Sequence, residues 1–286
     1  MVDKNTLIIC SAELENGYIF KNFFSFISLR GRPEITFLSD RIESKNRTTD
    51  NTIYGTAFLY GEEINLIWYQ SNKSLTLTFD SSLVQGTFGK IKKKDHARIM
   101  IVQLKYNNQK PGDENDYVIY LSCGAGGDSR EGIQTINAKK IEPSSTLIKQ
   151  PISGSILIVP SRLFRQMIDS FGKCKKQQIH IYFFENKESQ NSSGILISTN
   201  KLGSALEGII EKYGDVPEIR DQDDSDAENE YIVESDKILI FSKLASMHNE
   251  GSIRVYYSPG HNLKFCYRFG SFGECELYLT NKFVEI

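Results

Sequence analysis

Apolar and polar residues alternate along several short segments of this chain. Every second residue is apolar in 75–79 and 179–183, and the same period runs through 263–269, where Lys264, Cys266 and Arg268 hold the intervening positions. Successive side chains of a strand point to opposite faces, so this period predicts half-buried strands. The following residues, ECELYLTN, predict a hairpin partner near the C-terminus.

A second period, of three to four residues, predicts helices. In residues 17–29 the apolar side chains fall on one stripe of a helix, at Phe20, Phe23, Phe24 and Ile27. The same spacing recurs in 161–171 and in 235–247. Segment 81–91 fits a helix less well because it contains two glycines. The sequence therefore predicts four helices, two in each half of the chain.

The helix predicted at 161–171 carries positive charge away from its apolar stripe. Ser161 can cap its first turn, and the stripe consists of Phe164, Met167, Ile168 and Phe171. Arg162 and Arg165 fall on the opposite face. Two interpretations fit them: an ordinary solvated helix face or a surface that binds an anionic partner.

The predicted elements occur twice in the same order: strand, helix, strands, helix, strands. This internal repeat predicts an α+β fold of two topologically similar domains, each with antiparallel sheets and two helices. Between the halves, Gly, Ser and Pro concentrate and the periodicity fades, as in a connector. We therefore predict domain 1 at 1–123, an inter-domain connecting linker at 124–150 and domain 2 at 151–286.

The charge of the chain is balanced overall and segregated locally. Its 286 residues have a formal net charge of −2, which excludes nucleic-acid binding by the whole surface. However, 221–230 holds six acidic residues and no base, whereas the charged residues of 90–98 and 162–176 are mostly basic. Any binding of nucleic acid must therefore come from part of the surface.

Motifs for catalysis, cofactors or metals are missing. The acidic run lacks the glycine and the final glutamate of an EF-hand loop, and the segment GAGGDSREG lacks the third glycine of a phosphate cradle. The four histidines lie in separate elements, and the five cysteines form no CxxC pair. We expect no enzyme activity, no cofactor and no metal. The N-terminus resembles neither a signal peptide nor a membrane span, so we expect an intracellular protein without membrane contact.

The second half of the sequence resembles the DNA sliding clamps, the proliferating cell nuclear antigen family. VPSRLFRQMIDSF is similar to the strand and helix that open the family's second domain. The aromatic-hydroxyl-Lys triplet at 241–243, and Leu263, Tyr267, Tyr278 and Leu279, are similar to its last helix and closing hairpin. The match covers 150–184 and 238–283, and domain 1 matches in element order. A longer, glycine-rich linker and the segment ESKNRTTDN depart from the pattern and favour a divergent clamp of viral type.

The resemblance implies a processivity factor. Three copies of the two-domain chain would form a homotrimeric ring, with sheets outside and the helices on the inner face around duplex DNA. The ring would tether a DNA polymerase and other replication or repair proteins through their short hydrophobic peptides, at sites of replication in a nucleus or a viral replication compartment. DNA binding would not depend on base sequence. It would use the basic residues Lys21, Lys90, Lys92, Lys93, Lys94, Arg98, Arg162, Arg165, Lys173, Lys175, Lys176 and Lys243.

Two further surfaces follow from the resemblance. The groove for partner peptides would contain Ile133, Ile136, Ile141, Leu147, Tyr278 and Leu279. The subunit interface would pair two edge strands, through Val118, Ile119 and Tyr120 in domain 1 and Ile195, Leu196 and Ile197 in domain 2.

Less specific interpretations remain open for these residues. The lysines of 90–94 can simply keep a strand end soluble, and the aliphatic residues of the linker can pin it to the sheets. At the level of function, the alternative is a clamp-folded interaction or transcription factor that does not form a ring. An enzyme hidden in this fold is a third possibility.

Overall fold

The computed structural model describes residues 6–27, 33–47, 53–89, 91–92, 94–104, 117–125, 134–144, 155–171, 178–184, 194–198, 207–211, 230–246, 251–257 and 261–280. The chain forms two compact units. Unit 1 comprises Met1–Thr48, Gly55–Thr146 and Phe269–Glu274; unit 2 comprises Thr49–Tyr54, Leu147–Arg268 and Cys275–Ile286.

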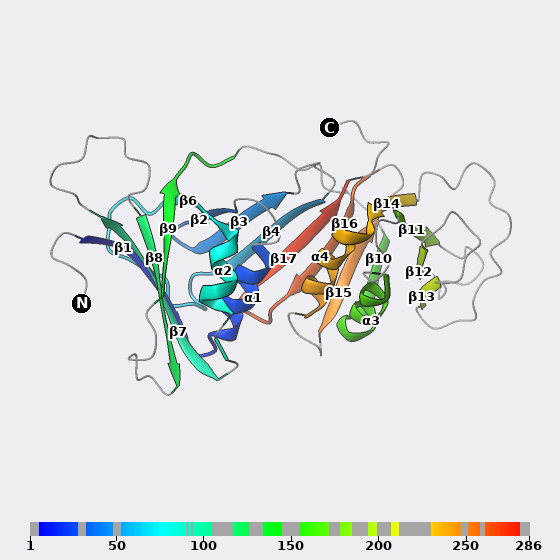
Figure 1. Cartoon of the computed structure of the whole chain (residues 1–286), viewed down its shortest axis with the longest axis horizontal. Helices are drawn as coiled ribbons and strands as arrows, with labels where there is room; N and C mark the ends of the chain where they lie inside the picture. The colour runs from blue at the N-terminus through cyan, green and yellow to red at the C-terminus, as the bar shows by residue number, and fades with distance from the viewer. Residues whose placement is uncertain are drawn as a thin grey trace. The chain divides into compact units, whose positions relative to one another are not determined.

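Unit 1 is a sheet with two helices on one face (Figure 1). Its strand order is β4-β3-β2-β6-β9-β8-β7-β1-β5. The elements are β1 (Thr6–Leu14), α1 (Tyr18–Ile27), β2 (Glu34–Phe37), β3 (Arg41–Arg47), β4 (Ile53–Tyr60), β5 (Ile67–Trp68), β6 (Leu75–Phe79), α2 (Ser81–Phe88), β7 (Asp95–Leu104), β8 (Tyr117–Ala125) and β9 (Gln134–Lys140).

Unit 2 has two rows of strands, ordered β10-β15-β16-β17 and β13-β12-β11-β14, and two helices. The elements are β10 (Ser155–Pro160), α3 (Ser161–Phe171), β11 (Gln178–Phe184), β12 (Gly194–Ser198), β13 (Glu207–Glu211), β14 (Glu230–Glu234), α4 (Ser235–Ser246), β15 (Ser252–Tyr257), β16 (Leu263–Arg268) and β17 (Gly273–Leu279).

The two units repeat one arrangement of strands. The row β9-β8-β7-β1 of unit 1 corresponds to β17-β16-β15-β10, and β6-β2-β3-β4 corresponds to β14-β11-β12-β13. Each unit also carries its two helices at the same points of this order. The predicted α+β class and the predicted internal repeat are therefore confirmed, and all four helices form where the apolar spacing placed them.

Aromatic rings join helices to sheet in unit 1. The ring of Phe24 on α1 stacks on that of Phe88 on α2, with ring centroids 3.9 Å apart. Its centroid also lies 6.4 Å from that of Phe79 on β6. We call the side of each sheet that packs on its helices the helix face. In unit 1 this face continues through three isoleucines that stand in register on β7, β8 and β9 and are almost fully buried: Ile101, Ile119 and Ile136.

Unit 2 is built on the same kind of contact. The ring of Phe265 on β16 packs against two helices. Its centroid lies 5.6 Å from that of Phe164 on α3 and 4.8 Å from that of Phe241 on α4. The predicted stripe of α3 is buried throughout. In α4 the apolar spacing predicted for 235–247 corresponds to Ile240, Phe241, Leu244 and Met247. The first three are buried as well, and Met247 lies outside the described residues.

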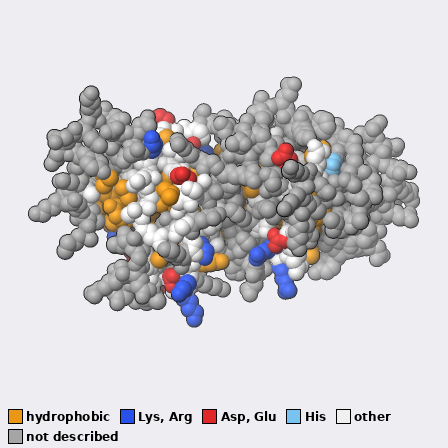
Figure 2. All heavy atoms as spheres, viewed as in Figure 1, with side chains coloured by type: hydrophobic (Ala, Val, Ile, Leu, Met, Phe, Trp, Pro, Cys, Tyr) orange, Lys and Arg blue, Asp and Glu red, His pale blue; other side chains and the backbone are white. Residues whose placement is uncertain are grey.

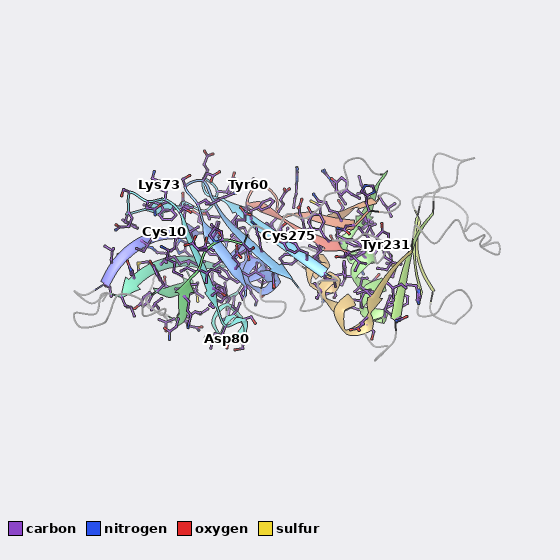
Figure 3. All side chains as sticks on the ribbon, turned by 90° about the horizontal axis from the view of Figure 1, so that it is seen from above. Cys10, Tyr60, Lys73, Asp80, Tyr231 and Cys275 are labelled. Carbon is purple, nitrogen blue, oxygen red and sulfur yellow. The ribbon has the colours of Figure 1, made fainter. Side chains whose placement is uncertain are left out.

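The N-terminus of α2 is capped by a side chain, whereas that of α3 is not capped by the side chain predicted for it. Asp80, labelled in Figure 3, accepts a hydrogen bond of 2.8 Å from the backbone N–H of Ser82, so it caps α2. The predicted cap of α3 is wrong: the Ser161 hydroxyl is buried and has no hydrogen-bond partner among the described residues. The Ser161 backbone N–H donates instead to the Gly251 carbonyl at 2.9 Å.

The predicted C-terminal hairpin is present as β16 and β17. Its turn uses Gly270 at φ 63°, a conformation that glycine adopts without strain. Just beyond the turn, a Cβ at Gly273 would lie 2.0 Å from the carbonyl oxygen of Phe58, so only glycine allows this close approach of two backbones.

Part of the predicted linker 124–150 is sheet. Gln134–Lys140 forms β9, which pairs along Gln134–Ala138 with β8 and through its last three residues with β6. The burial of Ile136 and Ala138 on the helix face explains this, because it gives the segment an apolar side.

The aromatic contact in unit 1 gives a stability prediction. Phe24→Ala removes a fully buried ring that touches Phe88 and Phe79, and we expect it to lower the free energy of unfolding by about 3–5 kcal/mol. Chemical denaturation measures this. Leu83→Ala on α2 is the control, because Leu83 is 46% exposed and its loss should cost no more than about 0.5 kcal/mol. Equal effects of the two substitutions would contradict the packing described.

Candidate nucleic-acid interface

Helix α3 presents a polar face to solvent because its apolar residues are committed to the core. Phe164, Met167, Ile168 and Phe171 are buried, whereas Arg162 and Arg165 are exposed, as the sequence predicted. Figure 2 shows Lys or Arg side chains beside an acidic one over this part of unit 2. This face is the strongest candidate for contact with an anionic partner.

The two arginines of α3 have different surroundings. Arg165 forms an ion pair with Asp169, one turn along the helix, with 3.5 Å between Nε and Oδ2. The other oxygen of Asp169, Oδ1, accepts a hydrogen bond from the Ser242 hydroxyl on α4. Arg162 makes no ion pair within the described part of the chain, and it lies in the first turn, where the helix dipole also favours an anion. Arg162 is therefore the better placed of the two for a phosphate.

Lys21 is committed to the fold. Its ammonium group donates to the carbonyl of Gly89 at 2.9 Å and to that of Ile91 at 3.1 Å. It also lies 5.3 Å from the centre of the Tyr18 ring. These bonds tie α1 to the segment that follows α2. Two of the three donors of Lys21 are thus occupied, and the predicted role in DNA binding has to compete with this structural one.

Arg98 lies on the side of β7 away from the helices. Its neighbours Ala97 and Ile99 are buried on the helix face, and alternation turns Arg98 outward. Its Nε is 3.9 Å from Glu13 on β1, and His96 Nε2 lies 2.9 Å from the same carboxylate. The structure therefore does not bring Arg98 together with the helices that were predicted to face DNA.

The other predicted basic residues are only partly described. Lys92 and Lys94 are exposed in the segment before β7, where the Lys92 backbone N–H donates to Asp95 at 2.8 Å. Lys243 lies on α4, next to Ser242. Five of the predicted basic residues lie outside the described residues: Lys90, Lys93, Lys173, Lys175 and Lys176.

The predicted edge strands are wrong, because both are interior. β8, which carries Val118, Ile119 and Tyr120, pairs with β7 on one side and β9 on the other. β12, which carries Ile195, Leu196 and Ile197, pairs with both β11 and β13. In the described part of the chain, β13 pairs with β12 alone, and the first half of β9, at residues 135–137, pairs with β8 alone. These two segments are therefore open edges, and β5, β10 and β14 are the other terminal strands.

Three of the six residues predicted to form the peptide groove are buried in the core. Ile136, Tyr278 and Leu279 are each no more than 1% exposed, so they belong to the core. Ile141 is half-buried, and Ile133 and Leu147 lie outside the described residues.

A partly buried polar cluster on the outer side of β15, β16 and β17 was not predicted from the sequence. Lys264 forms an ion pair with Glu276, and its ammonium lies 5.5 Å from the ring centres of both Tyr256 and Tyr278. Tyr278 donates to Glu276 at 2.5 Å. The polar position at 264 was visible in the sequence, but its partner depends on which residues the sheet brings together.

Burial keeps the proton on three side chains that would have to lose it to act as nucleophiles: Cys10, Tyr231 and Tyr267. Burial raises the pKa of Cys10 and of Tyr231 to about 12. Burial, followed by the charge of Cys275, raises the pKa of Tyr267 to about 12. These groups therefore stay protonated at neutral pH. Cys10, Tyr231 and Cys275 can be located in Figure 3.

In the described part of the chain, no group of His, Cys, Asp or Glu is placed to hold a metal ion, and no helix is long and apolar enough to span a membrane.

Comparison with solved structures identifies the fold. The chain is similar to a chain in the PCNA2-PCNA3 complex from Sulfolobus tokodaii, with TM-score 0.64 and 13% identity over 96% of this chain and 100% of that one. It is equally similar, at TM-score 0.64 and 11% identity, to a chain in a structure of the C-terminal region of FEN-1 bound to A. fulgidus PCNA, over 98% and 100% of the two chains. No protein-family model and no curated protein matches the sequence.

These matches show that the protein has the PCNA-like clamp fold, because they cover nearly the whole chain. The resemblance noticed in the second half of the sequence is confirmed at the level of fold, and it extends to domain 1, where only the element order had indicated it. Function does not follow from a likeness at this identity.

The structural role of Lys21 can be tested by substitution. Lys21→Ala removes the bonds to Gly89 and Ile91, and we expect it to lower the free energy of unfolding by about 1 kcal/mol. Urea denaturation measures this. Lys92→Ala is the matched control, because the bond of Lys92 to Asp95 uses its backbone and survives the change. If Lys21→Ala leaves stability unchanged and only weakens DNA binding, the structural assignment is wrong.

Proposed function

We propose that this protein is a DNA sliding clamp, a processivity factor that encircles duplex DNA and tethers replication and repair enzymes. The observation that carries the proposal is the exposed basic face of α3 on a clamp fold. In such a ring the helices of each chain would line the hole. We further propose that the protein catalyses no reaction itself and acts inside the cell, where DNA is replicated.

The charge pattern supports binding that is independent of base sequence. A cation near a phosphate releases a condensed counterion, which gives an attraction that depends on salt and ignores the bases. A clamp that slides needs this kind of contact, because a bidentate contact that discriminates bases by about 1–3 kcal/mol would hold it at favoured positions. The net charge of −2 is compatible with such a ring, since only the helix side has to be positive.

The open edges of the sheets support assembly into a ring. In unit 1, the backbone N–H of Tyr60, the last residue of β4, donates to Phe272, just before β17, at 2.9 Å. By the internal repeat, β13 corresponds to β4 and β9 to β17. We propose that β13 of one chain pairs with the open half of β9 of the next, and that three chains close the ring. Unpaired edges of this kind are templates for partner strands.

The partners we propose are a DNA polymerase and other replication or repair proteins that bind through short hydrophobic peptides. The structure described as FEN-1 bound to A. fulgidus PCNA gives a precedent in a protein of this fold. Of the predicted groove residues that the structure describes, Ile141 alone keeps part of its side chain at the surface. A groove here would therefore have to use Ile141 together with residues other than Tyr278 and Leu279.

One observation favours the alternative of a clamp-folded interaction factor that forms no ring. Lys21 and Arg165 are engaged within the chain, which leaves fewer cations for DNA. A sliding clamp requires a closed ring, whereas the interaction factor does not. DNA binding that weakens as salt rises is expected of the clamp and is not required of the interaction factor.

The DNA-binding proposal predicts an effect of Arg162. Arg162→Ala should weaken binding to a duplex of mixed sequence and reduce the slope of log K against log salt by about 0.9, because one phosphate contact is lost. Fluorescence anisotropy across a salt series measures both. Arg254→Ala is the control: Arg254 is exposed on β15, and its neighbour Val255 is paired with Phe265 on the helix face, so Arg254 points away. Equal losses from both substitutions would contradict a helix-lined interface.

The assembly proposal predicts opposite effects of opposite charges. Thr135 and Asn137 are exposed on the open half of β9, and the sequence of β13 begins and ends with glutamate. The pair Thr135→Glu and Asn137→Glu should therefore break the oligomer by like-charge repulsion, whereas Lys at the same two positions should preserve it. Sedimentation velocity distinguishes them. An oligomer that survives the Glu pair would place the interface elsewhere.

A further inference from the structure

Asp169 occupies the junction of the two helices of unit 2. Its carboxylate receives a hydrogen bond from Ser242 on α4 at one oxygen and pairs with Arg165 on α3 at the other. The side chains of Arg165 and Asp169 remain 44% and 47% exposed. An acidic group thus stands on the same surface as the arginines that we propose to contact DNA.

The contact with Ser242 distinguishes this ion pair from an ordinary pair on a helix surface. Most exposed pairs contribute little, because two long side chains must be ordered to form them. Here Ser242, from the second helix, already fixes the orientation of the carboxylate. Arg165 is the only member that has to be ordered, so Asp169 holds it more effectively than a freely rotating acid would.

We propose that Asp169 limits the strength of DNA binding by competing with phosphate for Arg165. This inference rests on the proposed DNA interface. When Arg165 is paired with Asp169, it releases no counterion from DNA, and the carboxylate also repels a phosphate that approaches α3. The Asp169 carboxylate is therefore a positioning group: it acts on DNA through Arg165 and keeps contact weak enough for the protein to move along the duplex.

The direct test is Asp169→Asn. The amide oxygen can still accept the Ser242 hydrogen bond, but the charge that holds Arg165 is gone. We expect DNA affinity to rise about two- to fivefold at low salt, and the salt slope to steepen by up to about 0.9. Glu62→Gln is the control, because Glu62 is an exposed acid in unit 1 and its loss changes the net charge equally. It should leave the slope unchanged.

A double substitution tests whether the effect passes through Arg165. In the Arg165→Ala background, Asp169→Asn should change the slope little, because there is no arginine to release. An equal increase in both backgrounds would mean that Asp169 acts only as a distant negative charge, and it would overturn the proposal. Thermal unfolding of each variant verifies that the fold is intact.

The outcomes separate this inference from the proposed function. If Arg162→Ala weakens binding but Asp169→Asn has no effect, the interface stands and the role of Asp169 is refuted. If the unmodified chain shows no salt-dependent binding of duplex DNA, both proposals fail together. If Asp169→Asn strengthens binding no more than Glu62→Gln does, the effect is one of net charge and the proposal is wrong.

Discussion

The structure depends on aromatic side chains that fasten two helices to one face of a sheet in each unit. In unit 1 these are Phe24, Phe79 and Phe88; in unit 2 Phe265 takes the central place between Phe164 and Phe241. Large buried rings supply much of the favourable free energy of such a core. Because each helix gives its apolar stripe to the sheet, its polar side must face outward.

This constraint decides where positive charge can act. On α3 it leaves Arg162 and Arg165 in solvent, and it brings Asp169 and Ser242 together where the two helices meet. On the strands, alternation sends Arg98 and Arg254 to the side away from the helices. A chain of nearly zero net charge can therefore present a basic helix surface without being basic as a whole. The proposed DNA contact and its proposed restraint by Asp169 both follow from this division.

The sequence predicted what local periodicity determines. The four helices, the apolar stripes and the C-terminal hairpin all formed as expected, because burial of one face imposes a period of two or of 3.6 residues. Local periodicity does not predict contacts between residues that are far apart in the sequence. Lys21 meets carbonyls 68 and 70 residues away, and Lys264 meets Glu276 across the sheet. The predicted edge strands β8 and β12 were wrong for the same reason, since only the pairing order reveals which strand is last.

A sliding clamp requires that clamp-folded chains associate into a closed ring, and the mass of the particle in solution tests this most directly. Light scattering coupled to size-exclusion chromatography, at micromolar concentration and physiological salt, measures it without a DNA ligand or a partner. A homotrimeric clamp is expected to have a mass near three times 32.5 kDa. A single chain of 32.5 kDa at every concentration would contradict a homotrimeric clamp and would favour the interaction factor that forms no ring.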